Sequence, residues 1–143
     1  MRRSAFSLVE LVVVVLILAI LVAIAGPRLL NVSDDAVDSG ARITLATLRG
    51  AIDHYAFEHG ELPGKDGSEA TFRSDLRPYL KGGFPSCPVG AENTGVEIST
   101  TAGGLGITGE STPTKGWHYH NKKGYFIINF TGLSKNGTPY DQF

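Results

Sequence analysis

The sequence has a single cysteine, Cys87, among its 143 residues. An intramolecular disulfide is therefore excluded, and an exported domain of this size would have to be held together by packing, by a bound ion or by neighbouring chains. Several enzyme motifs are also missing, because the chain has no G-x-S-x-G nucleophile elbow, no phosphate-binding P-loop and no paired-cysteine zinc motif. We therefore expect no catalytic residues, and Cys87 has no positional partner that would mark it as a nucleophile.

An excess of charge is missing as well. The chain has 13 basic and 14 acidic residues, which gives a formal net charge of −1. This balance provides no general electrostatic attraction to nucleic acid, so we expect no nucleic-acid partner. Glycine, by contrast, is frequent, with 18 residues that mostly follow residue 59. That distribution favours a loop-rich head with short strands over a second helical domain.

The histidines do not form an obvious metal site. His54 and Glu58 share one face of a predicted helix, whereas His59 points elsewhere, so these three residues make no compact ligand set. His118 and His120 would lie on one face of a strand, which is compatible with a metal, but no third ligand is evident. We therefore expect these side chains to be solvated, with His118 and His120 on a polar outer face, and we assign no metal ligands.

The most informative stretch is the apolar run near the start of the chain. No charged or strongly polar side chain occurs in Leu11–Gly26. With Phe6–Val9 the run reaches about 20 residues, which at about 1.5 Å per residue spans a bilayer core of about 30 Å. Arg2 and Arg3 precede it and would stay in the cytoplasm under the positive-inside rule. Glu10 is the exception, because an unpaired carboxylate in a membrane helix is costly and is a functional candidate by default.

Two simple interpretations explain part of this run. A secretory signal peptide would end near Ala23–Ala25, but the apolar run is longer than usual and Gly26-Pro27 follows the cleavage region directly. A plain single-pass anchor accounts for the length and for the two arginines. It does not account for Glu10.

The segment Ala5–Glu10, AFSLVE, resembles the class III signal of type IV pilins and type II secretion pseudopilins. The family pattern is a small residue, usually glycine, then Phe, Thr or Ser, two aliphatic residues and Glu; here Ala5 replaces the glycine. The resemblance implies cleavage between Ala5 and Phe6 by a prepilin peptidase, which also methylates the new amino terminus of Phe6. Gly26 and Pro27 fall where the family places a helix-breaking proline.

The chemistry of Glu10 agrees with this resemblance. Cleavage would leave Phe6 with a cationic amine at the edge of the bilayer, and methylation keeps that charge. A buried amine and a buried carboxylate are each costly alone and much less costly as a pair. We therefore hypothesise that Glu10 sets the register of incoming subunits during assembly. The alternative is an acid that snorkels to the headgroup boundary.

After Pro27 the helical pattern continues and becomes amphipathic, with apolar residues at three- and four-residue steps. Gly26-Pro27 removes a backbone donor, which predicts a kink or a locally melted turn there. Gly60 is the predicted C-cap and Pro63 the stop signal. The apolar stripe of this second half, which we expect to pack on the head, consists of Val37, Ala41, Leu45, Leu48, Ile52 and Tyr55.

The head is predicted to begin with a short helix that starts at Glu69, is capped by Ser68, and is ended or tightened by Pro78. Three later stretches have strand character: 96–101, 115–120 and 124–130, of which the last two form a hairpin. One face of this hairpin should pack against the long helix through Trp117, Tyr119, Phe126, Ile128 and Phe130. The predicted fold is α+β and pilin-like: a long N-terminal helix, kinked near Gly26-Pro27, on a small antiparallel sheet of three or four strands.

These features divide the chain into four parts: a cleaved leader (1–5), a transmembrane and filament-core half of the helix (6–26), an amphipathic half (27–59) and a small α/β head (60–143). The resemblance implies a non-enzymatic subunit of a type IV pilus-like or type II secretion filament. It implies self-assembly into a helical filament and dependence on the prepilin peptidase, an assembly ATPase and an inner-membrane platform. The expected location is the bacterial cytoplasmic membrane, single-pass with the head outside, and then the pilus or pseudopilus.

Some family properties are not supported by the residues. Major pseudopilins bind calcium in an acidic loop near the C-terminus, but the corresponding region Lys135–Asp141 has one acid, whereas calcium usually takes about six to eight oxygen ligands. We therefore assign no cofactor. The single cysteine also rules out the disulfide-closed loop of many type IV pilins. Two other functions stay open: a membrane-anchored binding module whose helix is only a tether, and an anchored extracytoplasmic enzyme.

Overall fold

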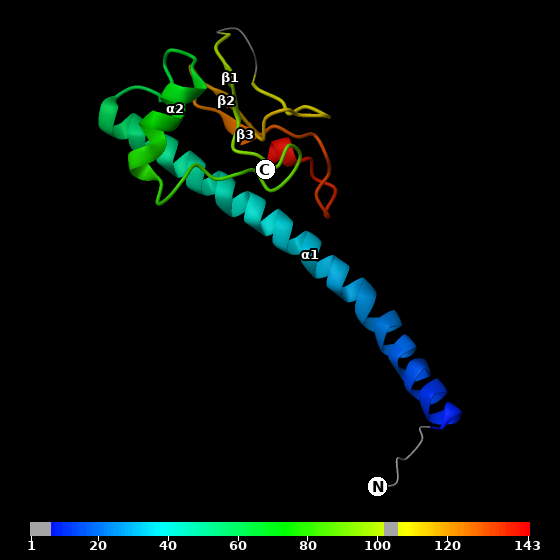
Figure 1. Ribbon diagram of the computed structural model, residues 1–143. Helices are drawn as coiled ribbons and strands as arrows, with labels where there is room; N and C mark the ends of the chain where they lie inside the picture. Colours follow the sequence, from blue (N-terminus) through cyan, green and yellow to red (C-terminus); the bar gives the residue numbers. More distant parts are fainter. Residues whose placement is uncertain (1–6, 102–105) are drawn as a thin grey trace. The chain divides into compact units, whose positions relative to one another are not determined.

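The computed structural model describes residues 7–101 and 106–143, except for the side chains of residues 27–33 (Figure 1). The elements in chain order are α1 (Leu8–His59), α2 (Glu69–Leu76), the 3₁₀ helix η1 (Arg77–Tyr79), β1 (Val96–Ser99), β2 (Trp117–His120), β3 (Phe126–Ile128) and the 3₁₀ helix η2 (Tyr140–Gln142). The chain forms two compact units, Met1–Ala36 and Val37–Phe143, and α1 contributes to both. The fold is α+β, as predicted.

The long N-terminal helix is confirmed, since α1 extends over 52 residues. Its backbone stays α-helical through Gly26 and Pro27, so the turn does not melt there, and the kink at this position stays a prediction. The helix ends as the sequence predicts. Gly60 has φ of +71°, which favours glycine, and its N–H donates to the carbonyl of Ala56 at 2.9 Å.

Helix α2 begins at Glu69, as predicted, but the predicted capping by the Ser68 side chain is wrong. Ser68 occupies the N-cap position and makes no capping bond with its hydroxyl. Asp66 organises this turn instead, because its carboxylate accepts the Ser68 N–H at 3.0 Å and the Thr71 hydroxyl at 2.7 Å. A carboxylate binds such donors more strongly than a neutral hydroxyl does. Pro78 lies within η1 and tightens the end of α2 into a 3₁₀ turn.

Within the described residues the sheet has three strands in the order β1-β2-β3, and the predicted hairpin is confirmed as the antiparallel pair β2–β3. The prediction of a wholly antiparallel sheet is wrong, because β1 pairs with β2 in parallel, with Val96 opposite Trp117. Parallel neighbours need a connection long enough to return to the starting edge of the sheet. The segment 100–116 supplies that length, and its glycines had suggested only a loop.

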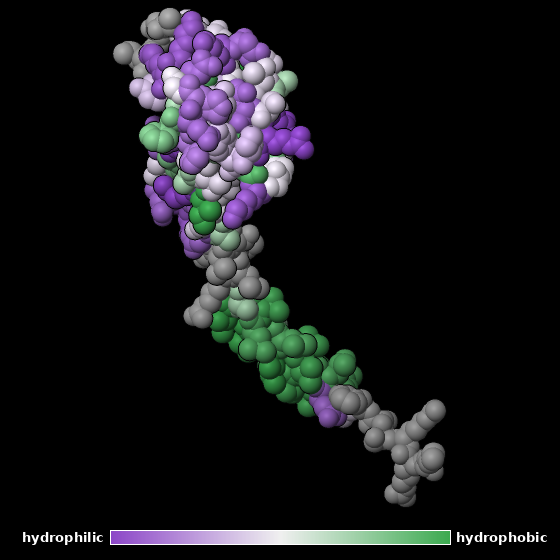
Figure 2. Space-filling model, turned by 90° about the vertical axis from the view of Figure 1, so that its left-hand side faces the viewer, coloured by the Kyte–Doolittle hydropathy of each residue, from purple (hydrophilic) through white to green (hydrophobic). Residues whose placement is uncertain are grey.

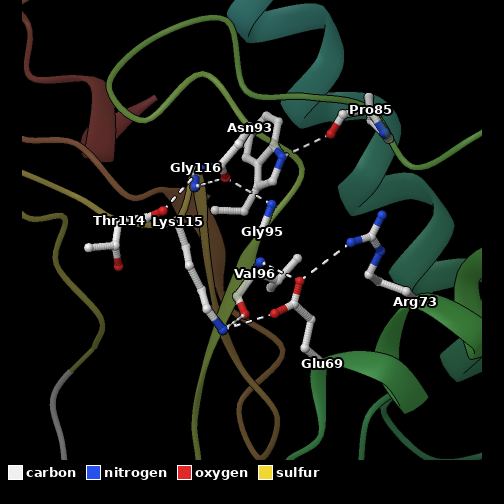
Figure 3. A network of polar contacts seen from close by, with 10 residues as sticks. Glu69, Arg73, Pro85, Asn93, Gly95, Val96, Thr114, Lys115 and Gly116 are labelled. Atoms are coloured by element: carbon white, nitrogen blue, oxygen red, sulfur yellow. Dashed lines mark hydrogen bonds and ion pairs between the residues drawn. The ribbon is translucent and has the colours of Figure 1, made fainter.

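One carboxylate ties the parallel strand to the rest of the head (Figure 3). Glu69, on the first turn of α2, accepts the N–H of Val96 at 3.1 Å and the ammonium of Lys115 at 2.9 Å. Lys115 also donates to the carbonyl of Val96 at 3.1 Å. Burial raises the pKa of Glu69, but the hydrogen bonds from Lys115 and Val96 outweigh it, so this pKa lies below its ordinary value. The start of β1 is thereby fixed to α2 and to the segment that leads into β2.

Asn93 makes a second set of contacts at the same end of the sheet (Figure 3). Its side-chain oxygen accepts the N–H groups of Gly95 at 2.9 Å and Gly116 at 3.0 Å, and its amide donates to the carbonyl of Thr114 at 2.9 Å. One amide side chain therefore joins the residues that precede β1 to those that precede β2. This contact fixes the parallel register at the start of the two strands.

The core lies between the sheet and the second half of α1, as the sequence predicts. Trp117, Tyr119, Phe126 and Ile128 are buried, and they pack with the apolar helix stripe in one cluster. Phe72 from α2 joins them, with its ring centroid 4.4 Å from that of Tyr119. Aromatic pairs at such distances add to the free energy gained by burying their surface.

The prediction that His120 lies on a polar outer face is wrong. Its side chain is 2% exposed, because the chain that follows β1 covers this end of β2. The Nδ1 atom accepts the N–H of Lys122 at 3.3 Å, which assigns the ring proton to Nε2, the atom that donates to the carbonyl of Thr101 at 3.0 Å. His120 is therefore a core residue with both ring nitrogens hydrogen-bonded.

The Glu69 contacts predict a pH-dependent stability difference. We expect Glu69→Gln to lower the free energy of unfolding at pH 7 by about 1–2 kcal/mol, because two hydrogen bonds lose the charged acceptor. Since the folded pKa of Glu69 is depressed, its contribution is complete above the ordinary value of 4.5 and is lost as the pH falls through the folded pKa. Thermal unfolding followed by near-UV circular dichroism at pH 7 and pH 3 measures this.

Glu61→Gln is the control, because the Glu61–Lys65 pair is largely exposed and should change the melting temperature little. A stability difference between Glu69→Gln and the wild type that is equal at both pH values would contradict the role of the carboxylate charge.

Candidate functional site: the apolar start of helix α1

The first part of α1 has an apolar surface in which Glu10 is the one charged residue. Leu8–Gly26 forms a stretch of 19 residues with mean hydropathy 3.3, long and apolar enough to cross a membrane, and none of it is buried within the chain. The large side chains from Leu8 to Ile24 are between 46% and 78% exposed. Figure 2 shows most of this segment as a hydrophobic surface, with a hydrophilic patch at one end. A surface of this size needs a covering of lipid or of other protein, because soluble monomers rarely expose apolar patches above a few hundred Å².

Ser7 and Glu10 together define the start of the helix. The Ser7 hydroxyl accepts the N–H of Glu10 at 3.2 Å, and the Ser7 carbonyl accepts the N–H of Leu11 at 3.2 Å. Ser7 is thus the N-cap, and Glu10 stands at the third helical position, where a negative charge is favoured by the helix dipole. The S-x-x-E spacing is that of a capping box, a signal in the sequence that our sequence reasoning did not use.

The site residues predicted from the sequence are only partly described by the structure. Ala5 and Phe6, the predicted cleavage pair, lie outside the described residues. Glu10 is exposed in the first turn of α1. Gly26 is half-buried, and the side chain of Pro27 is not among those described. The cleavage of Ala5–Phe6, the methylation of Phe6 and the assembly role of Glu10 therefore stay predictions.

Two arginines on the second half of α1 hold the last residue of the chain. Arg49 donates from Nε to the carbonyl of Phe126 at 3.0 Å and from Nη2 to the carbonyl of Phe143 at 2.9 Å. The guanidinium of Arg42 stacks on the Phe143 ring, with Cζ at 3.5 Å from the ring centroid. Burial lowers the pKa of Arg49, but the ordinary value of an arginine is so high that the side chain stays charged.

Asp38 makes a second attachment between α1 and the C-terminal segment. Its carboxylate accepts the hydroxyl of Tyr140 at 2.5 Å and the backbone N–H of Lys135 at 3.1 Å. Asp38 and Tyr140 are both buried, so these bonds are made largely out of water. A buried carboxylate without such donors would cost several kcal/mol, so the contact is both a stabilising link and a requirement for this packing.

The remaining candidate residues have structural surroundings. His118 contacts the hydroxyl of Ser99 at 2.7 Å and the carbonyl of Thr108 at 3.1 Å, which accounts for both ring nitrogens. Burial raises the pKa of the Cys87 thiol to about 11, so it is protonated and unreactive at neutral pH. Within residues 7–101 and 106–143, no group of three or more His, Cys, Asp or Glu side chains could hold a metal ion.

Comparison with known proteins identifies the N-terminal segment. Residues 1–26 match the family described as the prokaryotic N-terminal methylation motif. The chain is also 43% identical over 51 residues to the type IV narrow pilus major component PilA5 of Thermus thermophilus. That match covers 36% of this chain and 44% of the relative, so the chain spans less than half the length of the curated protein it matches. No solved structure matches the chain.

The apolar, acid-bearing helix and the family match together define a protein that carries the prokaryotic N-terminal methylation motif. Over 51 residues the chain is, more particularly, similar to a type IV pilus subunit.

The Asp38 contact predicts that removal of the Tyr140 hydroxyl lowers the stability of the head. We expect Tyr140→Phe to lower the free energy of unfolding by about 1–3 kcal/mol, because the buried Asp38 carboxylate loses a donor that the phenylalanine cannot replace. Urea unfolding of the detergent-solubilised chain measures it. Tyr125→Phe is the matched control, since Tyr125 is 51% exposed and should leave the midpoint unchanged. Equal midpoints for the two variants would show that the Asp38 contact contributes nothing.

Proposed function

We propose that the protein is a filament subunit of a type IV pilus or a related system, inserted in the membrane by the first half of α1, processed before Phe6 and then assembled into a helical filament. The observation that carries this proposal is the apolar surface of Leu8–Gly26, none of which is buried in the single chain. Lipid, and then other copies of the same helix, would cover it. The prokaryotic N-terminal methylation motif at residues 1–26 supports the processing step.

A filament core built from this helix would gain stability mainly from packing. Lipid tails are as apolar as leucine, so moving the helix from a bilayer into a bundle of helices yields little hydrophobic free energy. The direction and specificity of assembly must therefore come from polar groups and from the assembly machinery. The proposed partners are a prepilin peptidase, an assembly ATPase and an inner-membrane platform. The four-part division at residues 5, 26 and 59 belongs to the same proposal, as leader, core helix, amphipathic helix and head.

Glu10 is the polar group best placed to provide specificity. Cleavage before Phe6 would place a free cationic amine one turn before Glu10 in the same helix. A neighbouring subunit shifted along the filament axis would bring its own amine to the Glu10 carboxylate, and such a buried pair defines one register. The Ser7 cap matters here, because it fixes the start of the helix and so holds the Glu10 side chain at a defined height.

A pilus is favoured over a secretion pseudopilus by the comparison with PilA5, whose name describes it as a pilus component. The location that follows is the bacterial cytoplasmic membrane, single-pass with the head on the outside, and then the filament. The head would form the outer surface of that filament. Pilin-like subunits are structural, so we propose no enzymatic activity.

The mature amino terminus provides the first test. Mass spectrometry of the protein purified from its native host should show a chain that begins with N-methylated Phe6. Methylation adds one methylene to the mass and keeps the amine charged. An intact Met1, or a chain that begins after Ala25, would instead identify a plain anchor or an ordinary signal peptide and would overturn the proposal.

The role of Glu10 in register provides the second test. We expect Glu10→Val and Glu10→Gln to be inserted and processed normally, but to give less than a tenth of the wild-type filament in a sedimentation assay, because both lack the carboxylate charge. Ser7→Ala is the control that separates capping from pairing, since it removes the cap and keeps the acid; it should still assemble. Wild-type filament yields from Glu10→Gln would reject the pairing.

A further inference from the structure

A cavity of about 570 Å³ opens beside α2, outside every contact assigned above. Two of its lining residues are the arginines Arg73 and Arg77, spaced one helical turn apart, and none of the described acidic residues lines it. The exposed Lys81 follows one further step of four residues along the chain. The full lining consists of Ala70, Arg73, Ser74, Arg77, Leu80, Gly82, Gly83 and Phe84.

Arg73 is held in place before any ligand arrives. Its Nη1 atom lies 3.5 Å from a carboxylate oxygen of Glu69, and its guanidinium carbon lies 5.1 Å from the centroid of the Phe84 ring. Phe84 is itself fixed by an edge contact with Phe72, with centroids 6.1 Å apart. A guanidinium has five donors in a rigid fork, so these contacts leave donors for an anion in the cavity.

The guanidinium of Arg77 is available to bind an anion. Its side chain is exposed, and in the part of the chain that the structure describes no carboxylate pairs with it. The nearby acid in the sequence, Asp75, already accepts the N–H of Gly64 at 2.9 Å. Gly82 and Gly83, which also line the cavity, have nothing within 4 Å of the position that a Cβ would take, so this part of the lining is open.

We propose that this cavity is a phosphate-binding site, with Arg73 and Arg77 as its ligands for the anion. Guanidinium groups form short, charge-assisted hydrogen bonds with phosphate oxygens, and two of them one turn apart can hold one group from two sides. The phosphate is that of an anionic lipid headgroup or a free phosphate.

Phosphate titration of the full chain, solubilised in a non-ionic detergent, tests the site. Isothermal calorimetry with inorganic phosphate should give a saturable curve. Arg77→Gln should weaken binding about tenfold or more, the loss expected when one charge-assisted hydrogen bond is removed. Arg77 is exposed and makes no described side-chain contact, so this variant should fold; near-UV circular dichroism of the buried Trp117 checks it.

Lys122→Gln is the matched control, because Lys122 is exposed and lies outside the cavity lining. The substitution removes one positive charge, as Arg77→Gln does. Its phosphate affinity should stay within about twofold of the wild type, since a distant exposed charge is largely screened. Equal weakening in Arg77→Gln and Lys122→Gln would overturn the proposal, because the effect would then be one of net charge. An unsaturable wild-type titration would also overturn it.

Vesicles separate the two sources of phosphate. The full chain is reconstituted in phosphatidylcholine vesicles with and without a third of phosphatidylglycerol, and hydrogen exchange of the Gly82–Phe84 amides is compared. Protection that depends on phosphatidylglycerol and is lost in Arg77→Gln identifies the lipid headgroup as the ligand. Saturable binding of inorganic phosphate with identical exchange in both vesicles identifies free phosphate.

Discussion

The structure depends on one constraint, the need to keep the apolar surface of Leu8–Gly26 away from water. A helix satisfies its own backbone hydrogen bonds, so it is the one single-segment structure that can carry such a sequence through lipid. In the proposed filament, the same property would let the helix leave the bilayer and pack against other helices without refolding. The head, by contrast, has its own hydrophobic core, formed by residues of Val37–Phe143. The chain therefore combines one part that needs an external covering with one part that does not.

Regular patterns in the sequence predicted most of the helical structure. The three- and four-residue spacing of Ala41 to Tyr55 identified the stripe that packs on the sheet, and Gly60 marked the end of α1. The aromatic and β-branched alternation of residues 117–128 identified the hairpin and its buried face. These features depend on the spacing of apolar residues over a few positions, and that spacing can be observed in one sequence alone.

Contacts between distant residues were not predictable in the same way. The parallel pairing of β1 depends on Glu69, Asn93 and Lys115, whose side chains meet across loops and have no shared spacing. The burial of His120 depends on the chain that follows β1, and the Asp38–Tyr140 bond joins residues 102 positions apart. At the N-terminal site, Glu10 stands out in the sequence because it is the one acid in an apolar run. The N-cap at Ser7 is marked only by the S-x-x-E motif.

The attachments along α1 have a mechanical consequence. Asp38, Arg42 and Arg49 each bind the C-terminal part of the chain, and they are spread over more than two turns of the same helix. A force that pulls on α1 along its axis would load these contacts together, as in shear, and would not open them one after another. In the proposed filament under tension, the second half of the helix would transmit force to the rest of the head through several contacts at once. The head would therefore resist separation from α1.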